Sequence, residues 1–236
     1  MPAYTRRSYQ KELLDRDDIP FADIQKNMNE LNIVNTYLGG HKITCNGIKK
    51  ILDKQNTEPA DKTWIICEIG CGGGDNLLAI NKWCKKNNIK VFFIGIDINP
   101  HCIESAGSIP LDNLELIASD YRNVILNTKP DIIFSSLFCH HFTDEELESQ
   151  LQWLKKNSSR GFFINDLHRH PLAYHSIQIL TRLFSRSYLV KNDAPVSVLR
   201  GFKKSEWISL LKKADISDFN IEWKWAFRWL VVVNSQ

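Results

Sequence analysis

The sequence predicts an α/β fold in which helices cover both faces of a mostly parallel sheet. Short runs that are apolar throughout alternate with helical stretches over residues 60–236, as is typical of parallel strands buried on both faces. Phe219, Ile221, Trp223 and Trp225 instead alternate with polar residues, and the apolar run 229–233 follows closely, which predicts a hairpin. We therefore expect an antiparallel pair at one edge of the sheet.

Residues 1–55 are expected to form a helical prefix that caps the main domain. Apolar residues share one face of a helix over residues 23–38, and the Gly39-Gly40 pair predicts its end. A second helix is expected to begin near Thr44, a suitable N-cap. The polar segment 55–62 is interpreted as the linker to the main domain.

The main domain, residues 60–236, divides into strands and helices in a regular order. The expected strands are 64–69, 90–98, 114–118, 131–134 and 161–164, followed by the hairpin. The expected helices are 75–86, 100–106, one that opens at the capping box 143–146, then 172–183 and 205–214. The segment of about residues 168–200, which includes the polar stretch 191–195, is too long for a simple connection between the fifth strand and the next helix. We therefore expect a lid or substrate wall there.

The composition indicates one compact domain with a small appendage. Of the 236 residues, 43% are hydrophobic and 24% are charged, and the net charge is +3. The lysine pairs are scattered along the chain, so a nucleic-acid surface is not expected. The six cysteines form no Cys-x-x-Cys pair, and no apolar stretch is typical of a signal peptide or a membrane span. We expect a cytoplasmic protein, monomeric or homodimeric.

The turn after the first expected strand is the most informative segment. Residues 68–75 read Glu-Ile-Gly-Cys-Gly-Gly-Gly-Asp, and glycines let a ligand approach the backbone at the carboxyl end of a strand. A Walker loop needs Gly-Lys-Ser/Thr, which the chain lacks. A dinucleotide loop would place Asp75 where its last glycine belongs, facing a pyrophosphate. S-adenosylmethionine carries no phosphate and has a cationic end, so it tolerates acidic residues here.

Acidic residues also follow the next two expected strands. Asp97 ends the second, where its two oxygens can accept hydrogen bonds from both hydroxyls of a ribose. Asp120 follows the third, where it can accept from the amino group of adenine. An adenosyl ligand across three strand ends is therefore expected.

This series, Glu-x-Gly-x-Gly-x-Gly from Glu68, then Asp97 and Ser119-Asp120, resembles the motifs of class I S-adenosylmethionine-dependent methyltransferases over about residues 60–236. The resemblance implies a doubly wound, mostly parallel, seven-stranded Rossmann-like sheet with a terminal antiparallel hairpin. It also implies S-adenosylmethionine as cofactor and S-adenosylhomocysteine as product. It places Glu68, Gly70 and Gly72 near the methionine part, Asp97 at the ribose and Asp120 at the adenine. The residues expected at the cofactor are Glu68, Gly70, Cys71, Gly72, Gly74, Asp97, Ile98, Ser119, Asp120, Tyr121 and Ser135.

Three further motifs are similar to those of small bacterial methyltransferases that accompany type III polyketide synthases. They are Leu-x-x-x-Asn-x-x-Leu-Gly-Gly over residues 31–40, Asn-Asp-Leu-His-Arg over residues 165–169 and Ser-Val-Leu-Arg over residues 197–200. The resemblance implies a small-molecule acceptor of the phenolic, quinone or polyketide-like class, methylated on a hydroxyl. Asn35, within the first motif, either reaches the cofactor or caps a buried backbone group.

Histidine suits the removal of a proton from a hydroxyl acceptor, and three histidines follow neighbouring strands. His140 and His141 come after the fourth expected strand and His168 after the fifth. His168 is the first candidate for the base, because Asp166 lies close by in sequence. The three histidines and Asp166 are chemically able to bind zinc or iron, but no metal is expected.

Three other functions remain open at this point. The glycine-rich turn is similar to that of aminopropyl transferases, although Ser135-Ser136 do not provide the acid those enzymes need. A nucleic-acid methyltransferase would carry Asn/Asp-Pro-Pro-aromatic or Pro-Cys at the fourth strand, and neither occurs there. A non-catalytic protein that binds S-adenosylmethionine is the third alternative.

Overall fold

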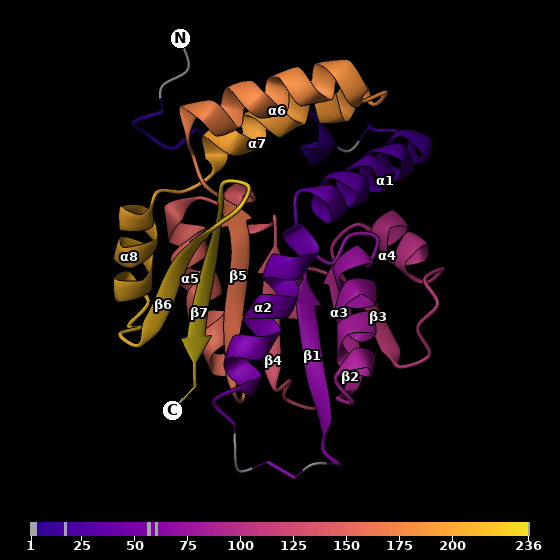
Figure 1. The fold of residues 1–236 in the computed structure, drawn as a ribbon, viewed down its shortest axis with the longest axis vertical. Helices are drawn as coiled ribbons and strands as arrows, with labels where there is room; N and C mark the ends of the chain where they lie inside the picture. The colour runs from indigo at the N-terminus through magenta and orange to yellow at the C-terminus, as the bar shows by residue number, and fades with distance from the viewer. Residues whose placement is uncertain (1–3, 17, 56–57, 60, 236) are drawn as a thin grey trace.

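A single sheet runs through the centre of the computed structural model, which describes residues 4–16, 18–55, 58–59 and 61–235 (Figure 1). Its strands are β1 (Thr63–Ile69), β2 (Lys90–Asp97), β3 (Leu114–Ala118), β4 (Ile132–Ser136), β5 (Gly161–Leu167), β6 (Phe219–Lys224) and β7 (Arg228–Asn234). In the described part of the chain the sheet has seven strands in the order β3-β2-β1-β4-β5-β7-β6. The expected fold class is confirmed.

The pairing directions place the ligand-bearing ends of the strands at one edge. The pairs of β1 with β2, β2 with β3, β1 with β4 and β4 with β5 are parallel. β7 lies antiparallel to both β5 and β6, as the hairpin pattern predicted. The carboxyl ends of β1 to β5 therefore lie together, and the order reverses between β1 and β4, where open α/β sheets bind ligands.

Helices cover both faces of this sheet. On one face α2 (Gly40–Leu52), α3 (Asp75–Lys86) and α4 (Pro100–Ala106) cover the strands. On the other face lie α5 (Asp144–Asn157) and α8 (Lys204–Lys213). Strand residues alternate between the two hydrophobic cores: Ile66 and Phe93 belong to one, and Cys67 and Ile94 to the other.

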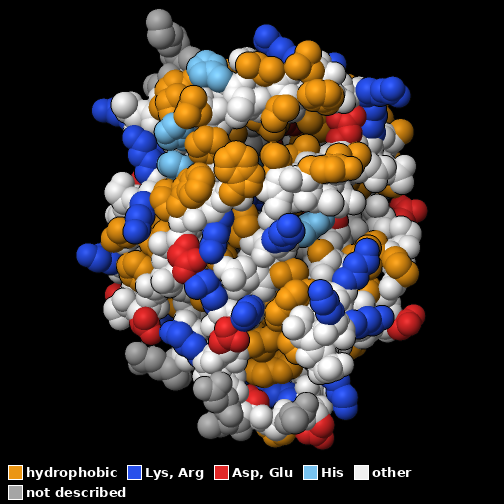
Figure 2. Space-filling model, viewed as in Figure 1, with side chains coloured by type: hydrophobic (Ala, Val, Ile, Leu, Met, Phe, Trp, Pro, Cys, Tyr) orange, Lys and Arg blue, Asp and Glu red, His pale blue; other side chains and the backbone are white. Residues whose placement is uncertain are grey.

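The remaining helices lie over the carboxyl edge of the sheet. They are α1 (Phe21–Tyr37), α6 (Pro171–Phe184) and α7 (Tyr188–Arg200), which meet above the strand ends (Figure 1). The expected lid insertion is thus a pair of helices, and the polar stretch 191–195 lies inside α7. Hydrophobic side chains gather on the surface at this end of the molecule (Figure 2). Among the described residues no helix has the length and apolar character needed to cross a membrane.

The start of the second prefix helix differs from the sequence prediction. α2 begins at Gly40, and Thr44 lies within it, where its hydroxyl donates to the carbonyl of Gly40 at 3.1 Å. Gly39 adopts a left-handed conformation, with φ at 79°, so the chain reverses at one residue and the next helix starts at once. The expected linker 55–62 lies partly outside the described residues.

Close contact between α2 and the sheet depends on the absence of a side chain at Gly47. A Cβ atom there would lie 2.4 Å from the ring of Phe163, which stacks on Phe134 at a centroid distance of 4.9 Å. A buried polar contact fixes the same helix, since Asn165 Nδ2 donates to Thr44 Oγ1 at 3.2 Å. The helical prefix is therefore packed directly on the strands that carry the site.

We expect Gly47→Ala to destabilise the fold by about 1–3 kcal/mol, because the added methyl group overpacks the contact with Phe163. Urea unfolding followed by circular dichroism measures the change. Gly73→Ala is the matched control, because its Cβ would have no neighbour nearer than Met28 Sδ at 3.6 Å. Equal unfolding midpoints for the two variants would contradict this account of the packing.

Candidate functional site

The glycine turn lies between the ends of β1 and β2. The backbone N–H of Gly70 donates to the carbonyl of Ile96 at 2.8 Å, and that of Gly72 donates to Asp97 Oδ2 at 2.9 Å. The turn leads into α3, which begins at Asp75. Backbone and carboxylate hydrogen bonds therefore fix residues 70–74 beside the first turn of a helix.

The two predicted aspartates lie at neighbouring strand ends. Asp97 also accepts from the N–H of Asn99, and Ser119 N donates to the carbonyl of Asp97 at 2.9 Å, which joins the ends of β2 and β3. Burial raises the pKa of Asp97, although hydrogen bonds from Asn99 and Gly72 oppose the rise. Asp120 is held by the exposed Arg122, whose Nη2 donates to it at 2.5 Å and whose hydrogen bonds lower its pKa. Ile98, next to Asp97, is 70% exposed.

Glu68 is fully buried beneath the glycine turn rather than exposed at its surface. Its Oε1 accepts from Asn76 Nδ2 at 2.9 Å, and its Oε2 has no hydrogen-bond partner among the described residues. Burial, together with the nearby charge of Asp75, raises the pKa of Glu68 well above its usual range. This side chain supports the turn from below and ties it to α3.

An aromatic contact joins the glycine turn to the segment after β4. The ring of Phe138 covers Gly70, where a Cβ atom would lie 2.3 Å from Phe138 Cδ2, and Gly70 itself has a φ of +69°. Tyr121, buried after β3, meets the same ring edge-on at 6.2 Å. Ser135, also buried, lies 3.4 Å from the thiol of Cys139. The turn after β4 is thus packed directly on the predicted cofactor site.

His140, in this turn, is buried and bonded to Asp166 at the end of β5. Its Nδ1 lies 2.8 Å from Asp166 Oδ1, and its backbone N–H donates to Asp166 Oδ2. Burial alone would lower the pKa of His140, but Asp166 and Glu12 raise it to about 9. The carboxylate expected to orient His168 therefore orients His140.

His168 lies apart from this pair. Its Nδ1 accepts from Trp223 Nε1 at 3.2 Å, and its ring packs edge-on against Trp229 at 4.8 Å. Burial, with the charges of His170 and Arg169, lowers its pKa to about 4. The prediction that Asp166 would orient or charge His168 was wrong, because the chain leaves the strand after Leu167 and the two side chains part.

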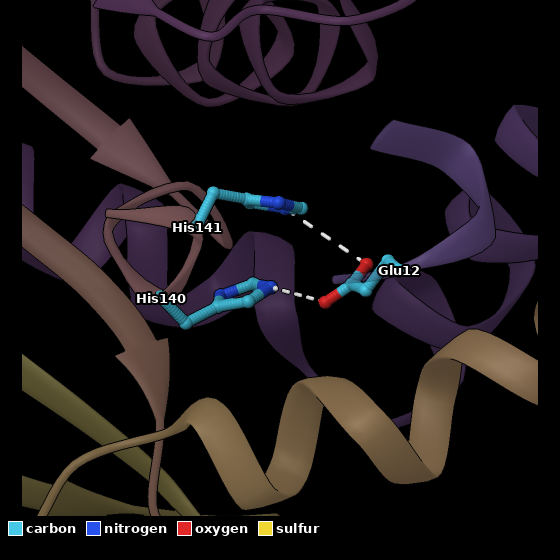
Figure 3. Close-up of side chains that lie close together, drawn as sticks. All are labelled: Glu12, His140 and His141. Carbon is cyan, nitrogen blue, oxygen red and sulfur yellow. Dashed lines mark ion pairs between the residues drawn. The ribbon is translucent and has the colours of Figure 1, made fainter. Parts of the chain in front are cut away.

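The N-terminal segment supplies residues that the sequence analysis missed. Glu12 faces both histidines of the turn: its Oε1 lies 3.5 Å from His140 Nε2 and its Oε2 lies 4.0 Å from His141 Nε2 (Figure 3). Asp15 Oδ1 lies 3.0 Å from His141 Nδ1. Burial opposes ionisation of Glu12, yet His140 and His141 hold its pKa below the usual range. Glu12 precedes the short helix 13–15 and Asp15 ends it, and so short a helix gives no periodic signal in the sequence.

Two buried arginines fix the segment against the turn. Arg200, at the end of α7, donates to the carbonyls of His140 and His141 at 2.9 and 2.7 Å and to Asp15 Oδ2 at 3.1 Å. Arg7 donates to the carbonyl of Phe142 at 2.5 Å and to that of Arg200 at 2.9 Å. The cluster around His140 is therefore built from three segments that lie far apart in sequence.

Asn35 is buried and bridges two elements. Its Oδ1 accepts from Arg228 Nη2 at 2.8 Å, and its Nδ2 lies 3.4 Å from Asp75 Oδ2. A cavity of about 600 Å³ opens beside it between α1, α2 and α3. Lys42, Lys49 and Asp75 line this cavity, whereas Asp97 and Asp120 do not. It lies on the helical side of the glycine turn, away from the histidine cluster.

Comparison with known proteins agrees with the fold. Residues 60–187 match the protein family described as a methyltransferase domain. The plantazolicin methyltransferase BpumL, solved with SAH, has a similar fold, with a TM-score of 0.68 and 16% identity over 93% of this chain and 92% of that one. A search of curated proteins finds no match.

Two other solved structures share the fold at similar identity. Magnesium protoporphyrin IX methyltransferase from Synechocystis PCC 6803, with bound SAH, gives a TM-score of 0.55 at 13% identity, covering 86% of this chain and 87% of that one. Human N-acetylserotonin methyltransferase, with SAM, gives 0.62 at 16% identity, covering 92% of this chain and 56% of that one.

We expect Arg200→Met to destabilise the fold by about 3–5 kcal/mol, because it leaves Asp15 and two backbone carbonyls without their buried cation. Arg122→Met is the comparison, because it removes the exposed arginine that pairs with Asp120. It should change the free energy of unfolding by at most about 1 kcal/mol. Urea unfolding midpoints measure both. If Arg200→Met lowered the unfolding midpoint no more than Arg122→Met, the hydrogen bonds of Arg200 would contribute little to stability.

Proposed function

Because the chain belongs to the family of methyltransferase domains, we propose that it transfers a methyl group from S-adenosylmethionine to a hydroxyl group of a small molecule. The acceptor class we propose is phenolic, quinone or polyketide-like. One observation carries the proposal: Phe138 packs the turn that bears the buried His140–Asp166 pair directly on Gly70 of the glycine turn. A proton-handling group thus lies beside the predicted cofactor loop.

Methyl transfer from S-adenosylmethionine requires only two further contributions from the protein. Methyl transfer is an in-line displacement at a sulfonium that its own charge already activates, so the protein must align the acceptor and remove its proton. In this proposal Asp97 holds the ribose and Asp120 the adenine, and the open turn 70–74 receives the methionine part. The similar folds crystallised with SAH or SAM support the choice of cofactor.

We assign proton removal to the cluster around His140 rather than to His168. Asp166 orients the His140 ring, and the ionised carboxylate of Glu12 faces its other nitrogen. Because these carboxylates raise the pKa of His140 to about 9, the neutral imidazole that can accept a proton becomes more abundant as the pH rises towards 9. His168 has a pKa of about 4, which makes it a weak base, and its Nδ1 is already engaged by Trp223. The α6–α7 pair above the strand ends would form the wall that excludes water from the acceptor.

Asp97→Ala should weaken the binding of S-adenosylhomocysteine at least tenfold, since charge-assisted hydrogen bonds to a ribose are worth about 1.5 kcal/mol or more. Isothermal titration calorimetry on the folded variant measures the affinity. Asp112→Ala is the control, because Asp112 is exposed and precedes β3 at the opposite edge of the sheet. Unchanged affinity in Asp97→Ala would rule out the ribose assignment.

His140→Gln should lower kcat about 100-fold or more while the affinity for S-adenosylhomocysteine stays within about threefold, because proton removal contributes about 10²–10⁴-fold. Turnover is followed as S-adenosylhomocysteine released with a panel of phenols, quinols and amines, and mass spectrometry identifies the methylated product.

His168→Ala serves as the comparison and should lose less than about tenfold in kcat. A larger loss of kcat in His168→Ala than in His140→Gln would make His168 the base. Turnover with amines alone would contradict the hydroxyl acceptor, and no release of S-adenosylhomocysteine with any compound, despite tight cofactor binding, would favour a non-catalytic binding protein.

A further inference from the structure

Three potential metal ligands converge at the turn after β4. The ligand atoms of Glu12, His140 and His141 all lie within 4.8 Å of one another (Figure 3). The separations from Glu12 to the two Nε2 atoms, 3.5 and 4.0 Å, are longer than good hydrogen bonds of about 2.7–3.2 Å. Ligands about 2.0–2.1 Å from a tetrahedral ion lie about 3.4 Å apart, so a small contraction of this cluster would enclose one ion.

The outer nitrogens of both imidazoles are already committed to carboxylates. Asp166 lies 2.8 Å from His140 Nδ1, and Asp15 lies 3.0 Å from His141 Nδ1. A hydrogen bond at Nδ1 fixes the tautomer whose Nε2 is free to bind a metal, and ligating histidines almost always have such a partner. Two adjacent histidines are thus oriented in the same way, with both Nε2 atoms towards one carboxylate.

From this arrangement we propose that Glu12, His140 and His141 bind one Zn²⁺ ion. Two imidazoles and one carboxylate are the ligand set of catalytic zinc sites, which leave a further position for water or substrate. Mg²⁺ and Ca²⁺ prefer oxygen ligands and do not fit two nitrogens. Iron(II) shares this ligand set and is tested as a competitor.

Burial and backbone anchoring prepare the cluster for an ion. The side chains of Glu12 and His140 are 4% and 3% exposed, whereas that of His141 is 24% exposed and provides the route of entry. Arg200 holds the carbonyls of both histidines, and Ser197 Oγ donates to Glu12 Oε1 at 2.7 Å. The ligands therefore keep their positions without the ion, and binding requires little ordering.

The role of the ion rests on the proposed function, whereas its binding does not. An acceptor hydroxyl that occupies the open position on Zn²⁺ would lose its proton more readily, because the cation stabilises the alkoxide or phenolate. The proton would leave to solvent or to a nearby carboxylate, and the oxygen would then attack the methyl group of the sulfonium, releasing S-adenosylhomocysteine. With zinc bound, His140 is a ligand and not the base, and the metal rather than the imidazole promotes loss of the acceptor's proton.

The test is zinc titration of the full chain after dialysis against a chelator, by competition with a fluorescent zinc indicator. We expect one tightly bound ion per chain, and at least about a 100-fold loss of affinity in Glu12→Gln and in His141→Ala. Asp166→Asn, which removes only an outer partner, should lose about 10–100-fold. His101→Ala, at an exposed histidine on α4, is the matched control and should bind like the wild type. Circular dichroism confirms that each variant is folded.

Three results would overturn the site. They are equal zinc affinity in the wild type and Glu12→Gln, tighter binding of iron(II) than of zinc, and a Co²⁺ spectrum with a thiolate charge-transfer band, which would place the metal on cysteines. Methyl transfer at an unchanged rate after zinc removal would overturn the catalytic role. Tight zinc binding without methyl transfer to any acceptor would count against the proposed function and not against the site.

Discussion

Buried charge at the turn after β4 is the constraint on which the arrangement of the candidate site depends. The carboxylates of Glu12 and Asp166 lie inside the molecule and both pair with His140. The side chains of Arg7 and Arg200 are also buried, and they pair with Asp144 and Asp15. An unpaired ion in such surroundings destabilises a fold by several kcal/mol, so each of these charges must meet its own partner as the chain closes. This requirement holds the N-terminal segment, the end of α7 and the β4 turn in one arrangement, with His140 at its centre.

Most of the fold could be predicted because its elements follow from local pattern. The expected bounds of α3, α4 and β3 agree with the structure, and the final hairpin pairs as its alternation indicated. Two elements differ from the prediction. Gly39 is left-handed, so α2 starts at Gly40 and not near Thr44. The polar stretch 191–195 lies within α7, and its Asp193 accepts the N–H groups of Leu13 and Leu14, partners far away in sequence that no local pattern records.

The candidate site also contains some residues that local sequence pattern predicts and others that it does not. Glycines and an aspartate at consecutive strand ends were enough to propose a cofactor side, since each lies next to a recognisable strand. The histidines were predicted as candidates, but their partners were not. Asp166 is two residues from His168 in sequence, yet it bonds His140 in the turn after the neighbouring strand β4, because the ends of parallel strands meet while the chain after β5 turns away. Glu12 reaches the cluster from the prefix, a contact that only the folded chain reveals.

The matched family region therefore does not describe the whole site. It spans residues 60–187, which include the glycine turn, Asp97 and the β4 turn, whereas Glu12 and Arg200 lie outside it on either side. Structures of this fold include plantazolicin methyltransferase, magnesium protoporphyrin IX methyltransferase and N-acetylserotonin methyltransferase. A shared sheet edge can serve one cofactor while the segments that close over it differ. In this chain the segments that close over the β4 turn are the N-terminal segment and α7, and the charges they place around His140 come from outside the matched family region.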